Sequence, residues 1–182
     1  MVLNRRVIYI TGRGGDANKG LGAYLKTLDE NRIGLSINSH FLKLSHDEQV
    51  GVVSKLMGDF DSADTLIVAN SYGAYLLLQV MLVLGSLKSQ VILLSPVMGR
   101  GMLMSTMFMS RPPGEHKVVE AEKRGSVLSG MRVSVHVGEH DDSVNICDIS
   151  KRLGIVDVYL VPKAGHDLPR DYVQKIIRPH LA

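Results

Sequence analysis

The sequence lacks several features that define common protein classes. It has one cysteine in 182 residues, Cys147, so an internal disulfide is excluded and a reducing compartment is favoured. It has no tryptophan, few other aromatic residues and no run of basic residues, so nucleic-acid binding is not expected despite a formal net charge of +3. Its longest apolar stretch, from Ala74 to Leu84, contains Gln79 and is too short to span a bilayer.

We also expect no targeting segment. The apolar run from Val7 to Ile10 is shorter than the apolar core of a secretory signal peptide, and a glycine-rich loop follows it. The chain length suits one domain, residues 1–182, which can bury a sufficient core without metals or disulfides. The sequence therefore predicts a cytoplasmic protein without a membrane span, and it is compatible with a monomer or a homo-oligomer.

Short apolar runs with strand character alternate with segments of helical character along the chain. The expected strands are residues 7–11, 33–37, 65–69, 90–94, 132–137 and 156–161. The expected helices are residues 21–28, 45–55, 72–84, 115–128, 144–152 and 171–177, and Ser45 and Glu48 have the spacing of a capping box. This alternation predicts an α/β fold, a three-layer αβα sandwich around a mainly parallel six-stranded sheet. Because such sheets bind ligands at the carboxyl ends of their strands, the residues that follow each strand are the candidate site residues.

The third expected strand ends in Ala69-Asn70-Ser71-Tyr72-Gly73 and runs directly into a helix. This is the small-x-Ser-x-Gly form of a nucleophile elbow, a sharp turn that lifts the serine hydroxyl out of the sheet. The start of the helix also directs the backbone N–H of Tyr72 toward an oxyanion that forms beside Ser71. Taken alone, the pentapeptide is equally consistent with Ser71 as an ordinary helix cap.

Two further strand ends carry the residue types that activate a serine. The fifth strand is followed by Asp141 and Asp142, and a carboxylate there can orient a histidine and stabilise its cation. The sixth strand is followed by His166, which can act as the base. The chain order serine, aspartate, histidine is that of a catalytic triad on this type of fold. Each residue also has an ordinary interpretation, since the aspartates can cap the next helix and a lone histidine is usually a surface residue.

The first expected strand ends in the glycine-rich loop Thr11-Gly12-Arg13-Gly14-Gly15. Its backbone can approach a substrate closely, and the N–H of Arg13 is our choice for the second oxyanion donor. The same loop contains Gly12-x-Gly14-x-x-Ala17, which matches a dinucleotide-binding fingerprint. A nucleotide-binding oxidoreductase is therefore a second hypothesis, although no acidic residue follows the second strand to bind the ribose hydroxyls.

With these strand ends, the sequence resembles the α/β-hydrolase superfamily over nearly its whole length, as a small member without the two N-terminal antiparallel strands. The resemblance implies that Ser71 is the nucleophile and that His166, in Gly165-His166, is the base. It implies Asp141, in Gly138-x-x-Asp141-x-x-Val144, as the acid rather than Asp142. The implied activity is that of a serine hydrolase that cleaves a small, apolar ester or thioester through an acyl-enzyme and needs no cofactor. Amidases and acyltransferases use the same residues, so these activities stay open as alternatives.

The resemblance leaves two features of the site open. Thr11 stands where the family usually has a histidine in its oxyanion loop, so Gly14 is an alternative donor to Arg13. A lid commonly follows the strand after the nucleophile helix, and residues 97–113 hold a methionine-rich segment at that position. Unbranched, polarizable side chains suit an adaptable apolar pocket, although such a segment can equally pack on the core. The candidate pocket residues are Met98, Met102, Met107 and Phe108.

Two other hypotheses complete the set. A metal hydrolase could be built from His140, Asp141, Asp142 and His166, but their spacing matches no strong metal-binding signature, so no metal site is expected. The fold could also serve as a non-catalytic binding protein, because fold alone does not determine function.

Overall fold

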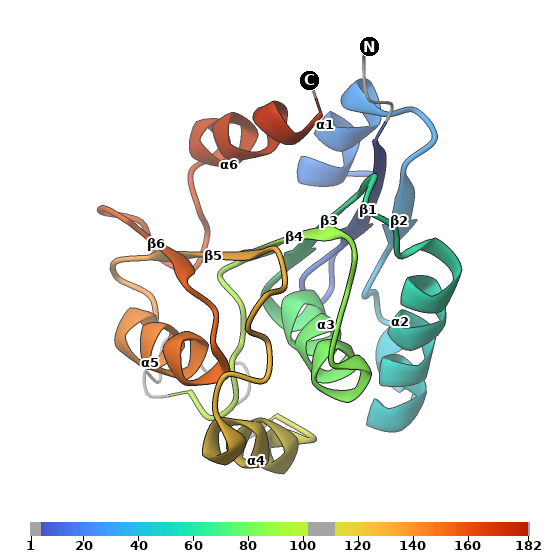
Figure 1. Ribbon diagram of the computed structural model, residues 1–182. Coiled ribbons are helices and arrows are strands. Elements are labelled where there is room, and N and C mark those ends of the chain that lie inside the picture. Colours follow the sequence, from blue (N-terminus) through green and yellow to red (C-terminus); the bar gives the residue numbers. More distant parts are fainter. Residues whose placement is uncertain (1–4, 102–111, 182) are drawn as a thin grey trace.

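The six apolar runs form the six strands of one parallel sheet in the computed structural model, which describes residues 5–101 and 112–181 (Figure 1). The strand order is β2-β1-β3-β4-β5-β6. The strands are β1 (Arg6–Ile10), β2 (Ile33–Leu35), β3 (Thr65–Asn70), β4 (Gln90–Leu94), β5 (Val133–Gly138) and β6 (Asp157–Val161). Since every strand pair in the sheet is parallel, all the strand ends singled out above lie along one edge. The predicted fold class is confirmed.

Helices cover both faces of the sheet. They are α1 (Leu21–Leu28), α2 (His46–Phe60), α3 (Ser71–Leu84), α4 (Glu115–Arg124), α5 (Ser143–Leu153) and α6 (Arg170–Ile177). Figure 1 shows α1 and α6 on one face and α2, α3 and α5 on the other, while α4 packs outside α3 and α5. Within the part of the chain that the structure describes, no helix is both long and apolar enough to cross a membrane.

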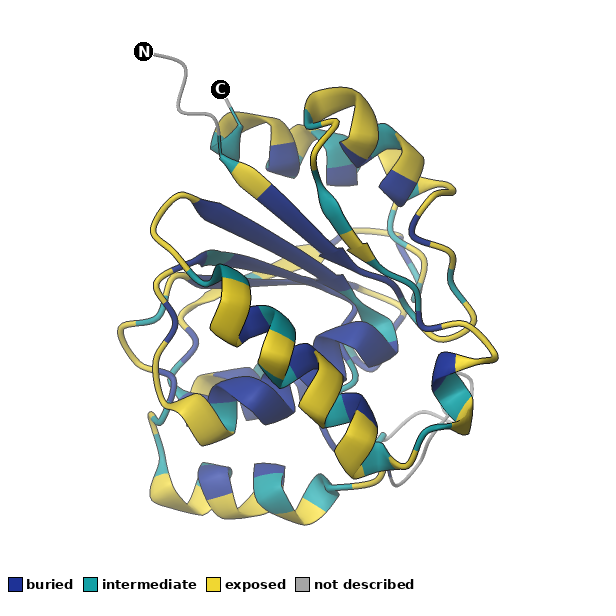
Figure 2. Ribbon diagram, turned by 90° about the vertical axis from the view of Figure 1, so that its right-hand side faces the viewer, coloured by how far each residue is buried: buried dark blue, intermediate teal, exposed yellow. Residues whose placement is uncertain are grey.

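Alternation of side chains along the central strands produces two separate cores. Val7 and Tyr9 of β1 pack toward α1 and α6, whereas Ile8 and Ile10 pack toward α2, α3 and α5. A parallel strand covered on both faces is buried along its whole length, which explains the near-continuous apolar runs (Figure 2). The helices show exposed outer faces in the same view, as expected of the outer layers of a sandwich.

Some predicted boundaries are wrong. The helix expected to reach residue 128 ends at Arg124, because Gly125 and Ser126 adopt positive φ angles of 69° and 50° that end the helical path. The second strand ends at Leu35 rather than at residue 37, and α2 continues to Phe60 rather than residue 55. Elsewhere, strands and helices begin and end within one residue of the prediction.

The predicted capping box at the start of α2 is confirmed. The Ser45 hydroxyl accepts a hydrogen bond from the Glu48 backbone N–H at 3.3 Å, and the Glu48 carboxylate accepts one from the Ser45 N–H at 2.7 Å. These two bonds satisfy backbone donors that a helix leaves without partners at its N-terminus.

Removal of the cap should destabilise the protein measurably. We expect Ser45→Ala to lower the free energy of unfolding by about 1 kcal/mol, because the N–H of Glu48 loses its acceptor. The measurement is urea denaturation followed by circular dichroism. Ser54→Ala, inside the same helix, is the control and should change the stability by less than about 0.5 kcal/mol. Equal effects of the two substitutions would show that the cap contributes nothing.

Candidate active site

Ser71 lies at the tight turn between β3 and α3. Its φ angle of 49° is in the left-handed region, which residues other than glycine rarely adopt. Gly73 follows two residues later, and a Cβ there would collide with the carbonyl oxygen of Thr11 at the end of β1. Ala69, two residues before the serine, is fully buried. The small residues of the motif are therefore required by the close packing of this turn.

The structure brings Ser71, His166 and Asp141 together from three different strand ends. His166 Nε2 lies 2.8 Å from Ser71 Oγ, and His166 Nδ1 lies 3.0 Å from Asp141 Oδ2. With Asp141 ionised, Nδ1–H donates to its carboxylate, which leaves Nε2 as the acceptor for the Ser71 hydroxyl proton. The Asp141 side chain is only 1% exposed, whereas that of His166 is 38% exposed. The histidine can therefore meet a ligand while its carboxylate partner is shielded from water.

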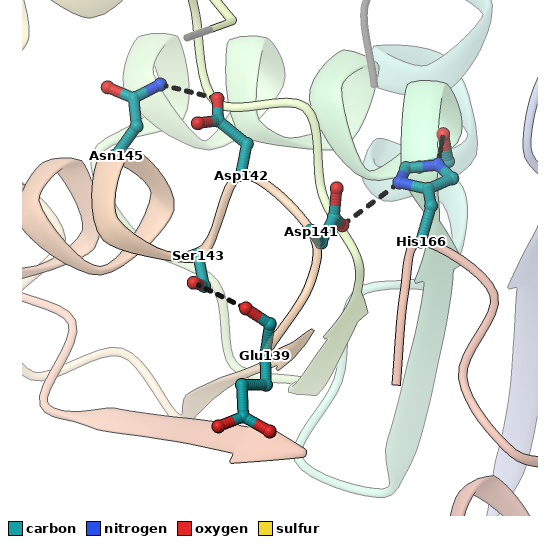
Figure 3. A network of polar contacts seen from close by, with 7 residues as sticks. Glu139, Asp141, Asp142, Ser143, Asn145 and His166 are labelled. Carbon is teal, nitrogen blue, oxygen red and sulfur yellow. Dashed lines mark hydrogen bonds and ion pairs between the residues drawn. The ribbon is translucent and has the colours of Figure 1, made fainter. Parts of the chain in front are cut away.

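Asp142, the other candidate acid, points away from the histidine. It precedes α5, and its carboxylate accepts a hydrogen bond from the side-chain amide of Asn145 at 3.0 Å. Figure 3 shows the two neighbouring aspartates diverging, one toward His166 and one toward Asn145. The geometry therefore joins Asp141, and not Asp142, to the histidine.

The loops that carry Asp141 and His166 are packed directly against each other. A Cβ at Gly138 would collide with the carbonyl oxygen of Gly165, so only glycine allows this approach. The His140 N–H donates to the Ala164 carbonyl at 2.8 Å and fixes the relative position of the loops. Sequence reasoning used Gly138 only as part of a motif, because nothing local indicates which segment faces it.

Asp141 sets the protonation behaviour of His166. Its hydrogen bond to the imidazole raises the pKa of His166 above the ordinary value of 6.5, burial opposes this shift, and the charges of Asp141 and Asp167 add to it. The cation that forms when His166 accepts a proton is therefore stabilised in place.

The glycine-rich loop after β1 lies next to the serine. A Cβ at Gly12 would lie 3.3 Å from Ser71 Cβ, so the loop backbone approaches the turn closely. The N–H of Gly14 donates to the Ile37 carbonyl at 2.7 Å and is already used. Thr11, at the position of the family histidine, accepts a hydrogen bond from the Ile37 N–H at 2.8 Å and so holds the loop to the chain after β2. The hydrogen bond of the Gly14 N–H disfavours Gly14 as an oxyanion donor.

Tyr72, whose backbone N–H is the other expected donor, is held by its side chain. Its hydroxyl donates to the side-chain carbonyl of Gln49 at 2.8 Å, and the Gln49 amide donates to the Leu44 carbonyl at 2.9 Å. Tyr72 and Gln49 are both buried, and burial raises the pKa of Tyr72. The sequence did not reveal Gln49, because the contact spans 23 positions of the chain.

A cavity of about 270 Å³ adjoins His166 between α1 and α6, and sequence reasoning did not find it. Met98 lies elsewhere: it packs in the core toward α5, and its sulfur accepts a hydrogen bond from Ser150 at 3.2 Å. It also lines a much smaller cavity of about 20 Å³ beside Asp141 and His166. Met102, Met107 and Phe108 lie outside the described residues.

The structure does not favour the metal and nucleotide hypotheses. In residues 5–101 and 112–181, no three His, Cys, Asp or Glu side chains are grouped closely enough to hold a metal ion. The fingerprint-like loop does not lead directly into a helix, because α1 begins only at Leu21. The N–H of Ala17, at the last fingerprint position, donates instead to the Ser36 hydroxyl at 2.8 Å. The loop thus lacks the direct helix start that binds a pyrophosphate.

Solved structures that share this architecture include a monoacylglycerol lipase, an esterase and a putative hydrolase, all of low sequence identity to this chain. A monoacylglycerol lipase from Paleococcus ferrophilus aligns with a TM-score of 0.67 at 11% identity, over 96% of this chain and 93% of that one. The ydeN gene product of B. subtilis gives 0.62 at 17% identity, over 97% and 98% of the two chains. SOBER1 of Arabidopsis thaliana gives 0.58 at 13% identity, over 98% and 99%. No protein-family model and no curated protein matches the sequence. The chain therefore has the α/β-hydrolase fold.

The pKa of His166 should depend on Asp141 and not on Asp142. We expect NMR titration of the histidine ring to give a pKa above 6.5 in the wild-type protein, with the neutral imidazole prevailing above that pKa. Asp141→Asn should lower this pKa by roughly one unit or more, because a neutral amide does not stabilise the cation. Asp142→Asn is the matched control and should leave it near the wild-type value. A larger shift in the His166 pKa in Asp142→Asn than in Asp141→Asn would show that Asp142, and not Asp141, is the partner of the histidine.

Proposed function

We propose that this protein is a serine hydrolase that cleaves a small, apolar carboxylic ester or thioester through an acyl-enzyme on Ser71. The observation that carries the proposal is the hydrogen-bonded chain from Ser71 through His166 to Asp141, with distances of 2.8 and 3.0 Å. The esterase and lipase names of the structural neighbours support the same reaction class. We place the activity in the cytoplasm, since the single cysteine, Cys147, is typical of a reducing compartment.

The first step is attack of Ser71 Oγ on the substrate carbonyl. His166 Nε2 takes the hydroxyl proton as the new Oγ–C bond forms, and Asp141 stabilises the resulting imidazolium without itself being protonated. When the tetrahedral intermediate collapses, the bond from carbon to the leaving oxygen or sulfur breaks. His166 returns its proton to that atom, so an alcohol or thiol leaves and the acyl group stays on Ser71.

Backbone N–H groups stabilise the negative charge that develops on the carbonyl oxygen, by donating hydrogen bonds to it. We assign this role to the N–H groups of Tyr72, which follows Ser71 in the chain, and of Arg13, which follows Gly12 in the loop that approaches Ser71. One such donor typically contributes about 3 kcal/mol to transition-state stabilisation. The side-chain anchor from Tyr72 to Gln49 and the link from Thr11 to Ile37 hold the two donors before substrate arrives.

Deacylation repeats the same proton transfers with water. His166 removes a proton from a water molecule as it attacks the acyl carbon, and then protonates Ser71 Oγ as the ester bond breaks. The products are the free acid and the regenerated enzyme, and no metal or organic cofactor takes part in these steps.

An activity-based probe tests the proposal directly. We expect a fluorophosphonate to phosphonylate Ser71 in the folded protein, with the site mapped by mass spectrometry. Ser71→Ala should abolish the adduct, and His166→Ala should slow its formation by roughly 10⁶-fold, because the serine then lacks its base. Ser95→Ala is the control and should be labelled like the wild type, since Ser95 also has a positive φ, of 39°, after a strand but has no hydrogen bond to His166.

Well-folded wild-type protein that forms no adduct would overturn the proposal and favour a non-catalytic binding protein. Labelling of Ser95 or of a surface serine, with Ser71 unlabelled, would also overturn the proposal. In either case the contacts of Ser71 would be structural.

The labelling rate should also depend on pH. Only neutral His166 accepts the serine proton, so the rate should rise with pH and level off above the pKa of His166, which lies above 6.5. In Asp141→Asn the rise should move to lower pH and the plateau rate should fall by roughly 10⁴-fold. A rate independent of pH between 5 and 9 would exclude His166 as the base.

A further inference from the structure

We propose that the cavity between α1 and α6 receives the leaving group of the substrate and selects an uncharged, apolar alcohol or thiol. This inference rests on the proposed serine hydrolase. It adds that the enzyme recognises the leaving group of the substrate. It places recognition on the α1 and α6 face of the sheet, far in sequence from the methionine-rich segment expected to form the pocket.

The cavity adjoins the reacting groups. Asn70, the residue before Ser71, and His166, the partner of its hydroxyl, both line it. The other lining residues come from the first turns of α1 and α6, the end of β4 and the loop after His166. Figure 1 shows these two helices side by side over the same face of the sheet. A group attached to the reacting carbonyl can therefore extend between them.

The surface that the cavity exposes is mainly apolar, and Asn70, His166 and Gln174 are among its polar lining residues. Its apolar side chains are Leu21, Tyr24, Leu94, Leu168 and Val173. The hydroxyl of Tyr24 accepts a hydrogen bond from Arg178 at 3.0 Å, so it already has a partner in the protein. The charged lining residues are exposed and of opposite sign, Asp167 and Arg170, so their formal charges cancel. Apolar walls without net charge favour an uncharged group.

The position of His166 identifies which part of the substrate enters. His166 must give its proton to the leaving oxygen or sulfur as the bond from that atom to the carbonyl carbon breaks. The leaving atom therefore lies beside the imidazole, and the chain attached to it continues along the loop of His166 into the cavity. Neither proposed oxyanion donor, Arg13 or Tyr72, lines this cavity, which agrees with a carbonyl oxygen directed away from it.

The volume limits the size of the group. A cavity of about 150 Å³ is sufficient for benzene, which has six carbon atoms. The present cavity of about 270 Å³ therefore holds a group of roughly ten non-hydrogen atoms on the same scale. An octyl chain with its oxygen fits this limit, whereas a longer alkyl chain must extend into solvent.

Two ester series test the inference with the same enzyme. In alkyl acetates the acyl group is constant and the alcohol grows from ethyl to decyl; in ethyl alkanoates the alcohol is constant and the acid grows. Acid release is followed in a pH-stat. We expect kcat/KM to rise by about fourfold for each methylene of the alcohol until octyl, and then to level off.

Substitutions that fill the cavity should remove this preference. Leu21→Trp on α1 and Gln174→Trp on α6 each place a large ring at a lining position that is partly exposed, where the fold tolerates it. In both variants the octyl-to-ethyl ratio in the acetate series should fall at least tenfold, while chain-length dependence in the alkanoate series stays as in the wild type. Because each ratio is measured within one protein, a loss of folded enzyme cancels.

Matched controls lie next to these residues on the same helices. Ala23→Trp on α1 and Lys175→Trp on α6 are exposed and do not line the cavity, and they should keep the wild-type ratios. If Ser71 is labelled by the fluorophosphonate but the alcohol series is flat in the wild type, the inference is wrong and the proposed function stands. If Leu21→Trp and Gln174→Trp change the chain-length dependence in the alkanoate series and not in the acetate series, the cavity does not bind the leaving group. Absence of Ser71 labelling would overturn both.

Discussion

The contact between the loops after β5 and β6 is the constraint on which the rest of the candidate site depends. Asp141 and His166 come from adjacent strands, and their side chains meet only if the two loops lie almost in contact. Gly138 permits that approach because a side chain there would strike the Gly165 carbonyl. The backbone hydrogen bond from His140 to Ala164 then fixes it. The geometry of the candidate site thus depends on a glycine, a residue without a side chain.

The serine is positioned by a second close approach, between the turn at Ser71 and the end of β1. Gly73 packs against the Thr11 carbonyl, and the Thr11 side chain bonds to the backbone of Ile37. The turn that presents the hydroxyl and the loop that carries Arg13 therefore share one structural support. A change that loosens the end of β1 therefore displaces both Ser71, the proposed nucleophile, and Arg13, the proposed oxyanion donor.

Much of the fold could be predicted because its signals are local. A parallel strand buried on both faces gives a continuous apolar run, and the elbow at Ser71 is a pentapeptide with fixed requirements. Features that depend on distant segments could not be predicted. The contact between Tyr72 and Gln49 and the cavity between α1 and α6 join segments that no pattern links. Gly125 shows the same limit, since a glycine within a helical pattern is compatible with both continuation and termination until its φ is known.

The strands that precede Ser71 and His166 differ in how fully neighbouring strands pair with them. Ser71 follows β3, which is paired on both sides in the middle of the sheet, whereas His166 follows β6, which pairs only with β5 among the described strands and is largely exposed. Amide hydrogens at a sheet edge exchange through openings of lower free energy than those in its centre. The proposed base, His166, therefore follows an edge strand, which is expected to open at a lower free energy than the central strands. Partial opening at β6 would separate His166 from Ser71 while the core around β3 stays folded, so the proposed activity would be lost at a lower free energy than the fold.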